Sequence, residues 1–241
     1  MIVVERDYFI AGLRVRMDTF GRTEKQAEPY LAETAETADI CITSEPSALH
    51  EKQPHLSMDA CEYLCTGASF YRQLLQFDGL LIHASAVVMD GYAYLFSAPC
   101  GTGKSTHTNL WRQAFGHEHV QMLNDDKPAI RRENGRWYAY GTPWSGKTDQ
   151  NINMRVPLGG VCVLARGETN EIAPFGGSEA IFALLEQTAR PPMAAARARL
   201  LELLDSLLTE IPVWKLHCTP TIEAAHTAHS AMARAAKDRF E

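Results

Sequence analysis

Long apolar runs are missing from this sequence of 241 residues. A helix that crosses a bilayer needs about 18 or more consecutive apolar residues, and no stretch here reaches that length. We therefore expect no membrane partner. The segment 1–18 carries charged residues throughout, whereas a secretory signal peptide has an uncharged apolar centre, so we also expect no signal peptide.

Closely spaced cysteine pairs and an excess of basic residues are missing too. The six cysteines form no Cys-x-x-Cys pair, and disulfide scaffolds are short and cysteine-dense, so we expect reduced thiols and a cytoplasmic protein. Lys and Arg number 23 against 29 Asp and Glu, which gives a formal net charge of −6. A general nucleic-acid binder carries a basic face, so we expect no nucleic-acid partner.

The composition that remains is that of a folded domain. Apolar residues make up 46% and charged residues 22%, which excludes a disordered chain. At roughly 150 residues per domain, the length predicts one domain or a tight two-lobed unit. Apolar strands alternate with helical stretches, which predicts an α/β fold with one main sheet. We expect an N-terminal strand and helix region over residues 1–79, packed on a core over residues 80–241.

Hydrophobic periodicity and turn residues locate the elements. Asp90-Gly91 and Asn134-Gly135 predict hairpin turns. Polar residues predict a loop with a short helix over 21–36 and a solvated connection over 44–53, and Gly67 marks a place where a helix over 57–76 can break. The strands are expected over residues 8–17, 38–43, 80–89, 92–97, 119–123, 129–132, 136–140, 159–165 and 212–218, and the other helices over 105–115, 178–188, 194–210 and 221–238.

The strongest motif runs from Ala98 to Thr106 and fits the phosphate-binding loop pattern, with Ala98 where Gly is usual. In such a loop, successive backbone N–H groups surround an anion at the positive end of the following helix. Lys104 would reach the outer phosphates, and Ser105 would bind Mg²⁺. The alternative is a Gly-rich turn without a ligand. The expected nucleotide-binding residues are Ala98, Pro99, Cys100, Gly101, Thr102, Gly103, Lys104, Ser105 and Thr106.

Polar residues that can carry chemistry also lie at the end of one apolar strand and within another. Asn124-Asp125-Asp126 ends the strand that follows the loop, and paired carboxylates at such a point hold Mg²⁺ and orient a nucleophile. The alternative is an acidic turn. His83 lies in the strand before the Asp90-Gly91 hairpin, which can bring it back beside the loop. The alternative is a hydrogen-bonded core histidine.

Weaker candidates follow the second hairpin. The loop 141–147 contains Trp144 and Lys147, which either close over a substrate or belong to a surface loop with a packed Trp. Arg155 either clamps a γ-phosphate or is solvated. We expect only packing, capping or solvent contact for Cys61, Cys65, His226, His229 and the leucines at 200, 203, 204, 207 and 208, with a dimer seam as the alternative for these leucines.

Together these segments resemble the superfamily of the HPr kinase/phosphorylases and the phosphoenolpyruvate carboxykinases. In carboxykinases a His-x-Ser-Ala segment precedes a Gly-Thr-Gly-Lys-Thr loop, and here His83-Ala-Ser-Ala86 precedes Gly101-Thr-Gly-Lys-Ser105 in the same order. The resemblance covers residues 80–145 well and the rest in general pattern. It implies a P-loop fold in which two mixed sheets face each other around the nucleotide site, with flanking helices.

The resemblance also implies roles for single residues. Lys104 and Ser105 match the residues for phosphate and Mg²⁺. Asp125 and Asp126 match paired aspartates, one near the metal and one the base of the HPr kinases. His83 matches a histidine that binds a second metal in carboxykinases and lies near the transferred phosphate in HPr kinases. We expect Asp125, His83 and Lys104 to be catalytic, with Asp125 the base, and Ser105 and Asp126 to hold the metal. The opposite assignment of the two aspartates stays open.

Departures from the superfamily narrow the expected function. The chain is far shorter than a carboxykinase, so we expect no decarboxylation, and it lacks the Arg-Gly-Leu-Gly-like segment of HPr kinases, which puts HPr in doubt as the acceptor. It looks closer to stand-alone HPr-kinase-like proteins, some of which sit in peptide-maturation gene groups or phosphorylate small hydroxyl substrates.

We expect a cytoplasmic kinase that moves the γ-phosphate of ATP to a hydroxyl of a protein, peptide or small molecule, with Mg²⁺ or Mn²⁺. The alternatives are a nucleotide-binding regulatory or peptide-maturation partner without phosphoryl transfer, and a simple NTP hydrolase. The sequence leaves open the acceptor, the reverse reaction, the choice between ATP and GTP, and assembly into a homo-oligomer.

Overall fold

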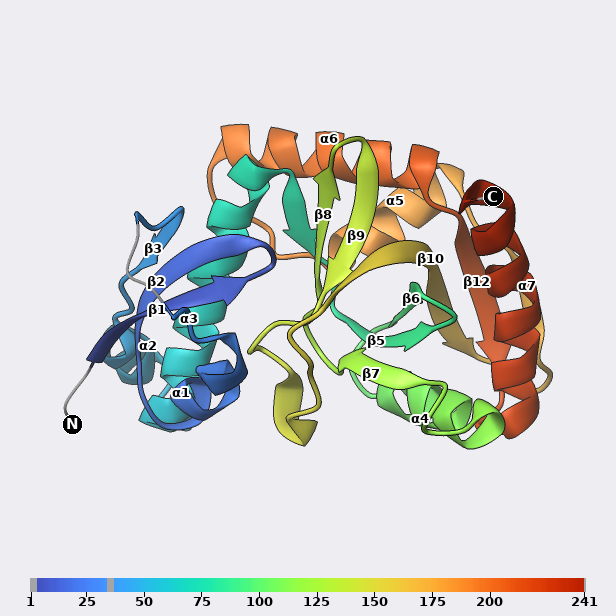
Figure 1. Ribbon diagram of the computed structural model, residues 1–241, viewed down its shortest axis with the longest axis horizontal. Coiled ribbons are helices and arrows are strands. Elements are labelled where there is room, and N and C mark those ends of the chain that lie inside the picture. Colours follow the sequence, from blue (N-terminus) through green and yellow to red (C-terminus); the bar gives the residue numbers. More distant parts are fainter. Residues whose placement is uncertain (1–3, 34–36, 241) are drawn as a thin grey trace.

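The computed structural model describes residues 4–33 and 37–240 and has a mixed α/β fold (Figure 1). Its first element is a hairpin of β1 (Val4–Ile10) and β2 (Leu13–Thr19), so the prediction of one strand over 8–17 was wrong. Ala11 and Gly12 have φ angles of 52° and 74°, and this two-residue turn reverses the chain so that Ile10 pairs with Leu13.

The helices of the N-terminal part pack beside this hairpin. A short strand, β3 (Ile40–Ile42), joins β2 in a three-stranded sheet. The predicted connection over 44–53 contains a helix, α2 (Pro46–Lys52), in which no residue is buried, so the sequence carries no apolar periodicity to reveal it. Residues 34–36 of the predicted loop lie outside the described residues. The remaining helical segments here are α1 (Gly21–Ala27), η1 (Glu28–Tyr30), α3 (Met58–Leu74) and η2 (Leu75–Phe77).

Helix α3 continues through Gly67 without the break that the sequence left open. A Cβ atom at Gly67 would lie 3.0 Å from Cδ1 of Trp144, so glycine lets the indole ring pack against the helix. Trp144 is fully buried there, stacked on Phe70 with ring centroids 4.9 Å apart. This glycine therefore serves close packing rather than a helix end.

A nine-stranded mixed sheet forms the rest of the fold. The predicted strand over 80–89 is two strands, because the chain leaves the sheet at Ile82 and His83. Residues 79–81 pair with residues 129–131, and residues 84–89 pair with residues 92–97 and 121–124. The strands are β4 (Gly79–Leu81), β5 (Ala84–Met89), β6 (Tyr92–Ser97), β7 (Gln121–Asn124), β8 (Ala129–Glu133), β9 (Arg136–Tyr140), β10 (Arg155–Arg166), β11 (Glu171–Pro174) and β12 (Val213–Cys218).

Strand β10 joins two parts of this sheet, which are continuous rather than separate. Its first residues pair with β9 in antiparallel fashion, and its later residues pair in parallel with β6 and β12. The register shifts between Leu158 and Gly160, and such a bulge bends a strand. A Cβ atom at Gly160 would lie 2.5 Å from the Trp214 ring, so a larger residue would push β12 away.

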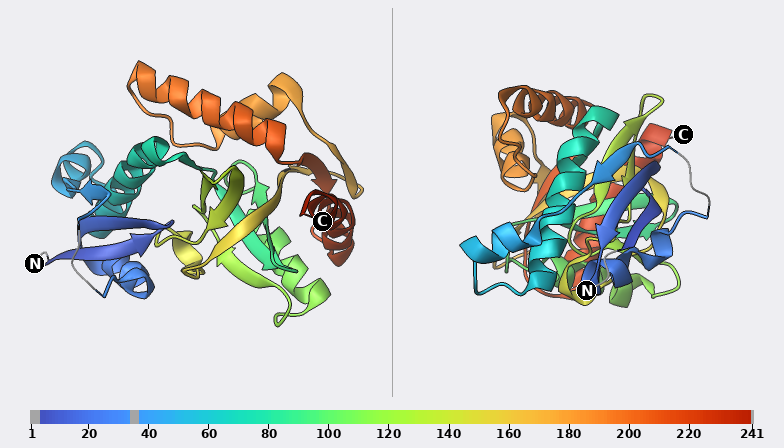
Figure 2. Two further views of the ribbon diagram at one scale, coloured as in Figure 1. Left: turned by 45° about the horizontal axis from the view of Figure 1, so that its top comes forward. Right: turned by 90° about the vertical axis from the view of Figure 1, so that its left-hand side faces the viewer.

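Helices cover both faces of the sheet (Figures 1 and 2). On one face, α4 (Lys104–Phe115) and α7 (Ile222–Phe240) pack on β6, β10 and β12. On the other, α5 (Gly177–Glu186) and α6 (Ala194–Glu210) cover β4, β5 and β10. Within the described residues, no helix has the length and apolar character to cross a membrane. The division at residues 79 and 80 stays a prediction.

The leucine stripe of α6 is a core face, as predicted. Leu200, Leu203, Leu204 and Leu207 are at most 3% exposed and pack in the cluster beneath the sheet. No dimer seam is needed to bury them.

Two leucines of α6 test this packing. Leu204 is fully buried, whereas Leu201 is 46% exposed. Leu204→Ala should lower the free energy of unfolding by about 2–5 kcal/mol, because it leaves a cavity, and Leu201→Ala should change it by about 0.5 kcal/mol or less. Equal losses in urea denaturation of the two variants would contradict this account of the core.

Candidate functional site

The strand order brings the three sequence motifs to one edge of the sheet. Strand β5 lies between β6 and β7 and is antiparallel to both. Its first residue, Ala84, pairs with Ser97 at the end of β6, and Ala86 pairs with Asn124 at the end of β7. His83, which precedes β5, therefore lies at the same edge as the loop after β6 and the aspartates after β7.

The loop between β6 and α4 turns tightly at two glycines. Gly101 and Gly103 have φ angles of 77° and 121°, which residues with a Cβ atom rarely adopt. Gly103 is the N-cap of α4, and no side chain among the described residues caps this end. The first N–H groups of α4 therefore stay available to an anion.

Lys104 is the first residue of α4 and turns back across the loop. Its Nζ donates a hydrogen bond to the carbonyl of Ala98 at 2.9 Å, and the residue is 8% exposed. Burial lowers the pKa of Lys104, while the charges of Asp126, Cys100 and Asp125 act in the opposite direction. The ammonium is thus held at the mouth of the loop, within the field of both aspartates.

Asp125 is buried and linked to the first turns of α4. Its Oδ1 accepts a hydrogen bond from Ser85 at 2.6 Å, and its Oδ2 accepts one from Thr148 at 2.7 Å. Because the Ser85 hydroxyl donates to Asp125, it accepts the hydrogen bond from the Thr108 hydroxyl of α4 at 2.8 Å. These two hydroxyls fix the carboxylate of Asp125 relative to α4 and the loop that precedes it.

Asp126 forms a second, more exposed group. Its Oδ1 lies 2.9 Å from Nε2 of His83, and its Oδ2 pairs with Lys127. Burial raises the pKa of Asp126, but the hydrogen bond from His83 and the charge of Lys127 outweigh it and lower the pKa to about 2. The side-chain amide oxygen of Asn124 accepts hydrogen bonds from the backbone N–H groups of Asp126 and Lys127 at 2.9 and 2.7 Å. The chain therefore turns after β7, and both aspartates lie at the same edge of the sheet.

The break in the strand places His83 at this site rather than in the core. The backbone N–H of His83 donates to Gln187 at 2.7 Å, and its carbonyl accepts from the Ser97 hydroxyl at 3.0 Å. The side chain is 31% exposed and contacts Asp126. The structure thus brings together His83, Asp126 and the loop, while their chemical roles stay predictions.

The loop 141–149 contributes a residue that the sequence did not reveal. Thr148, in η3 (Gly146–Thr148), bonds to Asp125, and a lone threonine in a loop gives no signal of this. Trp144 packs in the core, as the surface-loop alternative predicted, and Lys147 is exposed. Arg155 is exposed and pairs with Glu133 at 3.1 Å, which agrees with the solvated alternative.

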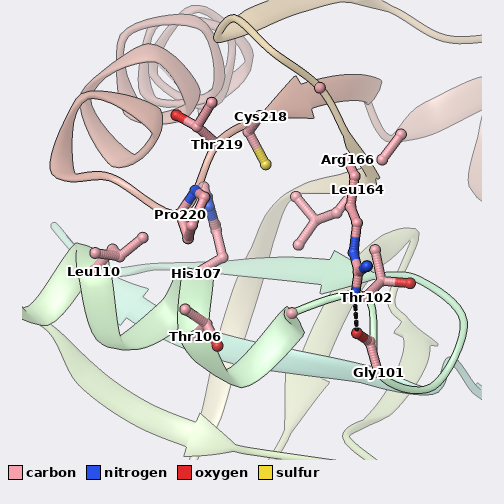
Figure 3. Close-up of a pocket in the computed structure, with 13 residues that line it drawn as sticks. Gly101, Thr102, Thr106, His107, Leu110, Leu164, Arg166, Cys218, Thr219 and Pro220 are labelled. Carbon is pink, nitrogen blue, oxygen red and sulfur yellow. Dashed lines mark hydrogen bonds between the residues drawn. The ribbon is translucent and has the colours of Figure 1, made fainter.

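A cavity of about 410 Å³ lies beside the loop between β6 and α4 (Figure 3). Leu110 of α4 and Leu164 of β10 give it apolar walls, and the guanidinium of Arg166 donates to the carbonyl of Gly101 at 2.8 Å. Burial lowers the pKa of His107 in its wall to about 4, so this imidazole is neutral at neutral pH. The sequence carries no signal of the cavity, because its walls come from three segments: 101–110, 164–167 and 218–220.

In the described part of the chain, no three His, Cys, Asp or Glu side chains lie close enough together to bind a metal ion by themselves. His226 and His229 pack against Phe115 of α4 with ring centroids 5.0 and 4.6 Å away. Cys61 is buried. A magnesium site that uses one or two carboxylates together with phosphate oxygens needs no such cage.

The family described as SynChlorMet cassette protein ScmC matches this chain over residues 57–221. The chain belongs to this family. No curated protein matches it. Among solved structures, the HPr(Ser) kinase/phosphatase from Coxiella burnetii is similar in fold, with a TM-score of 0.39 and 12% sequence identity. That match covers 64% of this chain and 97% of the other.

The contact between His83 and Asp126 predicts a pH dependence of stability. Because the pKa of Asp126 falls from 3.8 to about 2 on folding, its ionised form stabilises the folded state above about pH 4, by roughly 2 kcal/mol, and this is lost as pH falls towards 2. The free energy of unfolding of the wild type minus that of Asp126→Asn should shrink on acidification from pH 5 to 3. In a His83→Ala background the shrinkage should be smaller. A difference that does not depend on pH would contradict the pairing.

Proposed function

We propose that this member of the ScmC family is an ATP- and Mg²⁺-dependent phosphotransferase with a P-loop fold. The observation that carries the proposal is the meeting of Lys104, His83, Asp125 and Asp126 at one edge of the sheet. A loop that binds only phosphate does not need two carboxylates beside it. Phosphoryl transfer needs both a phosphate cradle and groups that place a nucleophile.

The phosphates and the nucleoside of ATP would bind at separate positions beside the loop. The backbone of Ala98–Thr106 and the ammonium of Lys104 would hold the phosphates. The adjoining cavity, at about 410 Å³, falls within the roughly 300–1,000 Å³ of small-molecule pockets. Its apolar walls at Leu110 and Leu164 suit the faces of a base, and it opens on Gly101 and Gly103 of the loop.

The residues present suit Mg²⁺. Asp126 is ionised at neutral pH, because its pKa is about 2, and Ser105 offers a hydroxyl in the first turn of α4. Carboxylate and hydroxyl oxygens are hard ligands that Mg²⁺ prefers. When bound, the metal neutralises charge on the phosphates. We place Ser105 and Asp126 at the metal, with Mn²⁺ able to replace Mg²⁺.

Asp125 is the base in this proposal. The hydroxyls of Ser85 and Thr148 fix its carboxylate, which would take the proton of the acceptor hydroxyl. The acceptor oxygen then bonds to the γ-phosphorus, the bond from this phosphorus to the β–γ bridging oxygen breaks, and ADP leaves with that electron pair. Lys104 stabilises the transferring group, and His83 holds Asp126 beside it. A simple NTP hydrolase would use water in place of the acceptor.

Nucleotide binding is tested with two ligands, ATP and inorganic tripolyphosphate, by calorimetry. Lys104→Ala removes a charge-assisted phosphate contact, which is worth about 1.5–3 kcal/mol. It should weaken both ligands about ten- to hundredfold. Leu164→Trp fills the cavity and should weaken ATP about tenfold or more while tripolyphosphate binds as before. Unchanged ATP binding by Lys104→Ala would refute nucleotide binding at this loop. Unchanged ATP binding by Leu164→Trp would refute the placement of the nucleoside in the cavity.

Transfer is tested with γ-labelled ATP and cell extract split into large and small molecules. The wild type should label an acceptor. Asp125→Asn should keep ATP affinity and lose transfer by about 10²–10⁴-fold, as expected for a positioned base. Asp126→Asn should instead raise the Mg²⁺ requirement and recover in part with excess Mg²⁺ or Mn²⁺.

Two other outcomes decide between the alternatives. Release of labelled phosphate without a labelled acceptor would make the protein a hydrolase. ATP binding without any turnover above that of Lys104→Ala would make it a regulatory or peptide-maturation partner.

A further inference from the structure

One charged side chain beside the site has no part in the reaction as proposed: Arg22 of α1. Its guanidinium lies over the ring of Tyr63, 4.2 Å from the centroid, and donates a hydrogen bond to the carbonyl of Gly146. The residue is half-buried, and within the described chain no carboxylate pairs with this guanidinium. The Asp59 carboxylate accepts the backbone N–H of Arg22 at 3.1 Å and makes no ion pair with the guanidinium, so this partly desolvated cation is suited to a bound anion.

Gly146 connects Arg22 to both aspartates. Its N–H donates to the Tyr63 hydroxyl at 3.0 Å, while a Cβ atom built on it would lie 2.8 Å from Cβ of Asp126. Thr148, two residues later, donates to Asp125 at 2.7 Å. The carbonyl that accepts the hydrogen bond from Arg22 therefore belongs to Gly146, which packs directly on Asp126.

Two further cationic side chains, Lys127 and Lys147, lie close to Gly146. Nζ of Lys127 lies 4.9 Å from the centroid of the Tyr63 ring, the ring that Arg22 also covers, but Lys127 pairs with Asp126. Lys147 follows Gly146 and is exposed, and no acidic partner contacts it in the part of the chain that the structure describes. Neither the Arg22 guanidinium nor the Lys147 ammonium pairs with a carboxylate of the described residues, so both can attract an added negative group.

We propose that Arg22, assisted by Lys147, binds a carboxylate or phosphate group of the acceptor and so holds the acceptor hydroxyl at the aspartates. This inference rests on the proposed phosphotransferase function. A guanidinium binds either group through two parallel hydrogen bonds, and the anionic group itself forms and breaks no covalent bond. The acceptor is then an anionic hydroxyl compound or peptide, in which the hydroxyl lies a short distance from the negative group.

The variants separate charge from structure. Arg22→Gln keeps an N–H donor for the Gly146 carbonyl and loses the charge. Arg22→Lys keeps the charge and loses the pair of parallel N–H donors of the guanidinium. Arg234→Gln removes an exposed arginine of α7 and is the matched control. With γ-labelled ATP and a limiting amount of the acceptor fraction, Arg22→Gln should label about ten- to hundredfold less than the wild type. Arg22→Lys should lie between them, and Arg234→Gln should match the wild type. At saturating acceptor, Arg22→Gln should recover most of the rate, and its ATP affinity should be unchanged.

Chemical treatment of the acceptor fraction identifies the anion. One portion is amidated with carbodiimide and glycinamide to neutralise carboxylates, and another is treated with phosphatase to remove phosphates. Loss of acceptor activity after one treatment supports the proposal and shows which group Arg22 binds. Full acceptor activity after both treatments, or wild-type labelling by Arg22→Gln at limiting acceptor, would overturn it. Wild-type labelling no greater than that of Lys104→Ala would instead refute the proposed function.

Discussion

Antiparallel pairing of β5 with both β6 and β7 is the constraint on which the site depends. It places the start of β5 beside the ends of its two neighbours, so that His83, Ala98 and Asp125 meet although they are distant in sequence. A slip of one residue would turn the side chains of β5 to the opposite face. Ser85 would then lose its hydrogen bond to Asp125, and the link from this carboxylate to α4 would break.

The packing of the helices supports the same edge. Trp111 of α4 is fully buried in the cluster that also contains Phe96 of β6, so the helix cannot tilt away from the strand that leads into the loop. On the opposite face, the carbonyl of Gln187 accepts the His83 N–H at 2.7 Å. This contact ties the break before β5 to the end of α5 and fixes where the imidazole ring stands.

Most of the core elements were predictable, because they carry strong local signals. The hairpin turns at Asp90-Gly91 and Asn134-Gly135 have positive φ angles at both residues, and the periodicity of α6 gave its bounds, Ala194–Glu210. The turn at Ala11-Gly12 lacks the Asp-Gly or Asn-Gly pair of the other two hairpins, and β11 is largely exposed, so neither had a strong signal. The loop, His83 and the aspartates were recognised from their motifs. Thr148, Arg22 and the cavity were not, because each depends on contacts between distant segments.

The central claim is that Mg·ATP binds at the edge where the three motifs meet. Amide hydrogen exchange with and without Mg·ATP tests it directly, since bound phosphates and the ordering of the loop protect backbone N–H groups. We expect slower exchange over residues 98–107 and 124–127, with little change in α6 on the opposite face. No protection over 98–107 at saturating Mg·ATP, or protection confined to other segments, would contradict it.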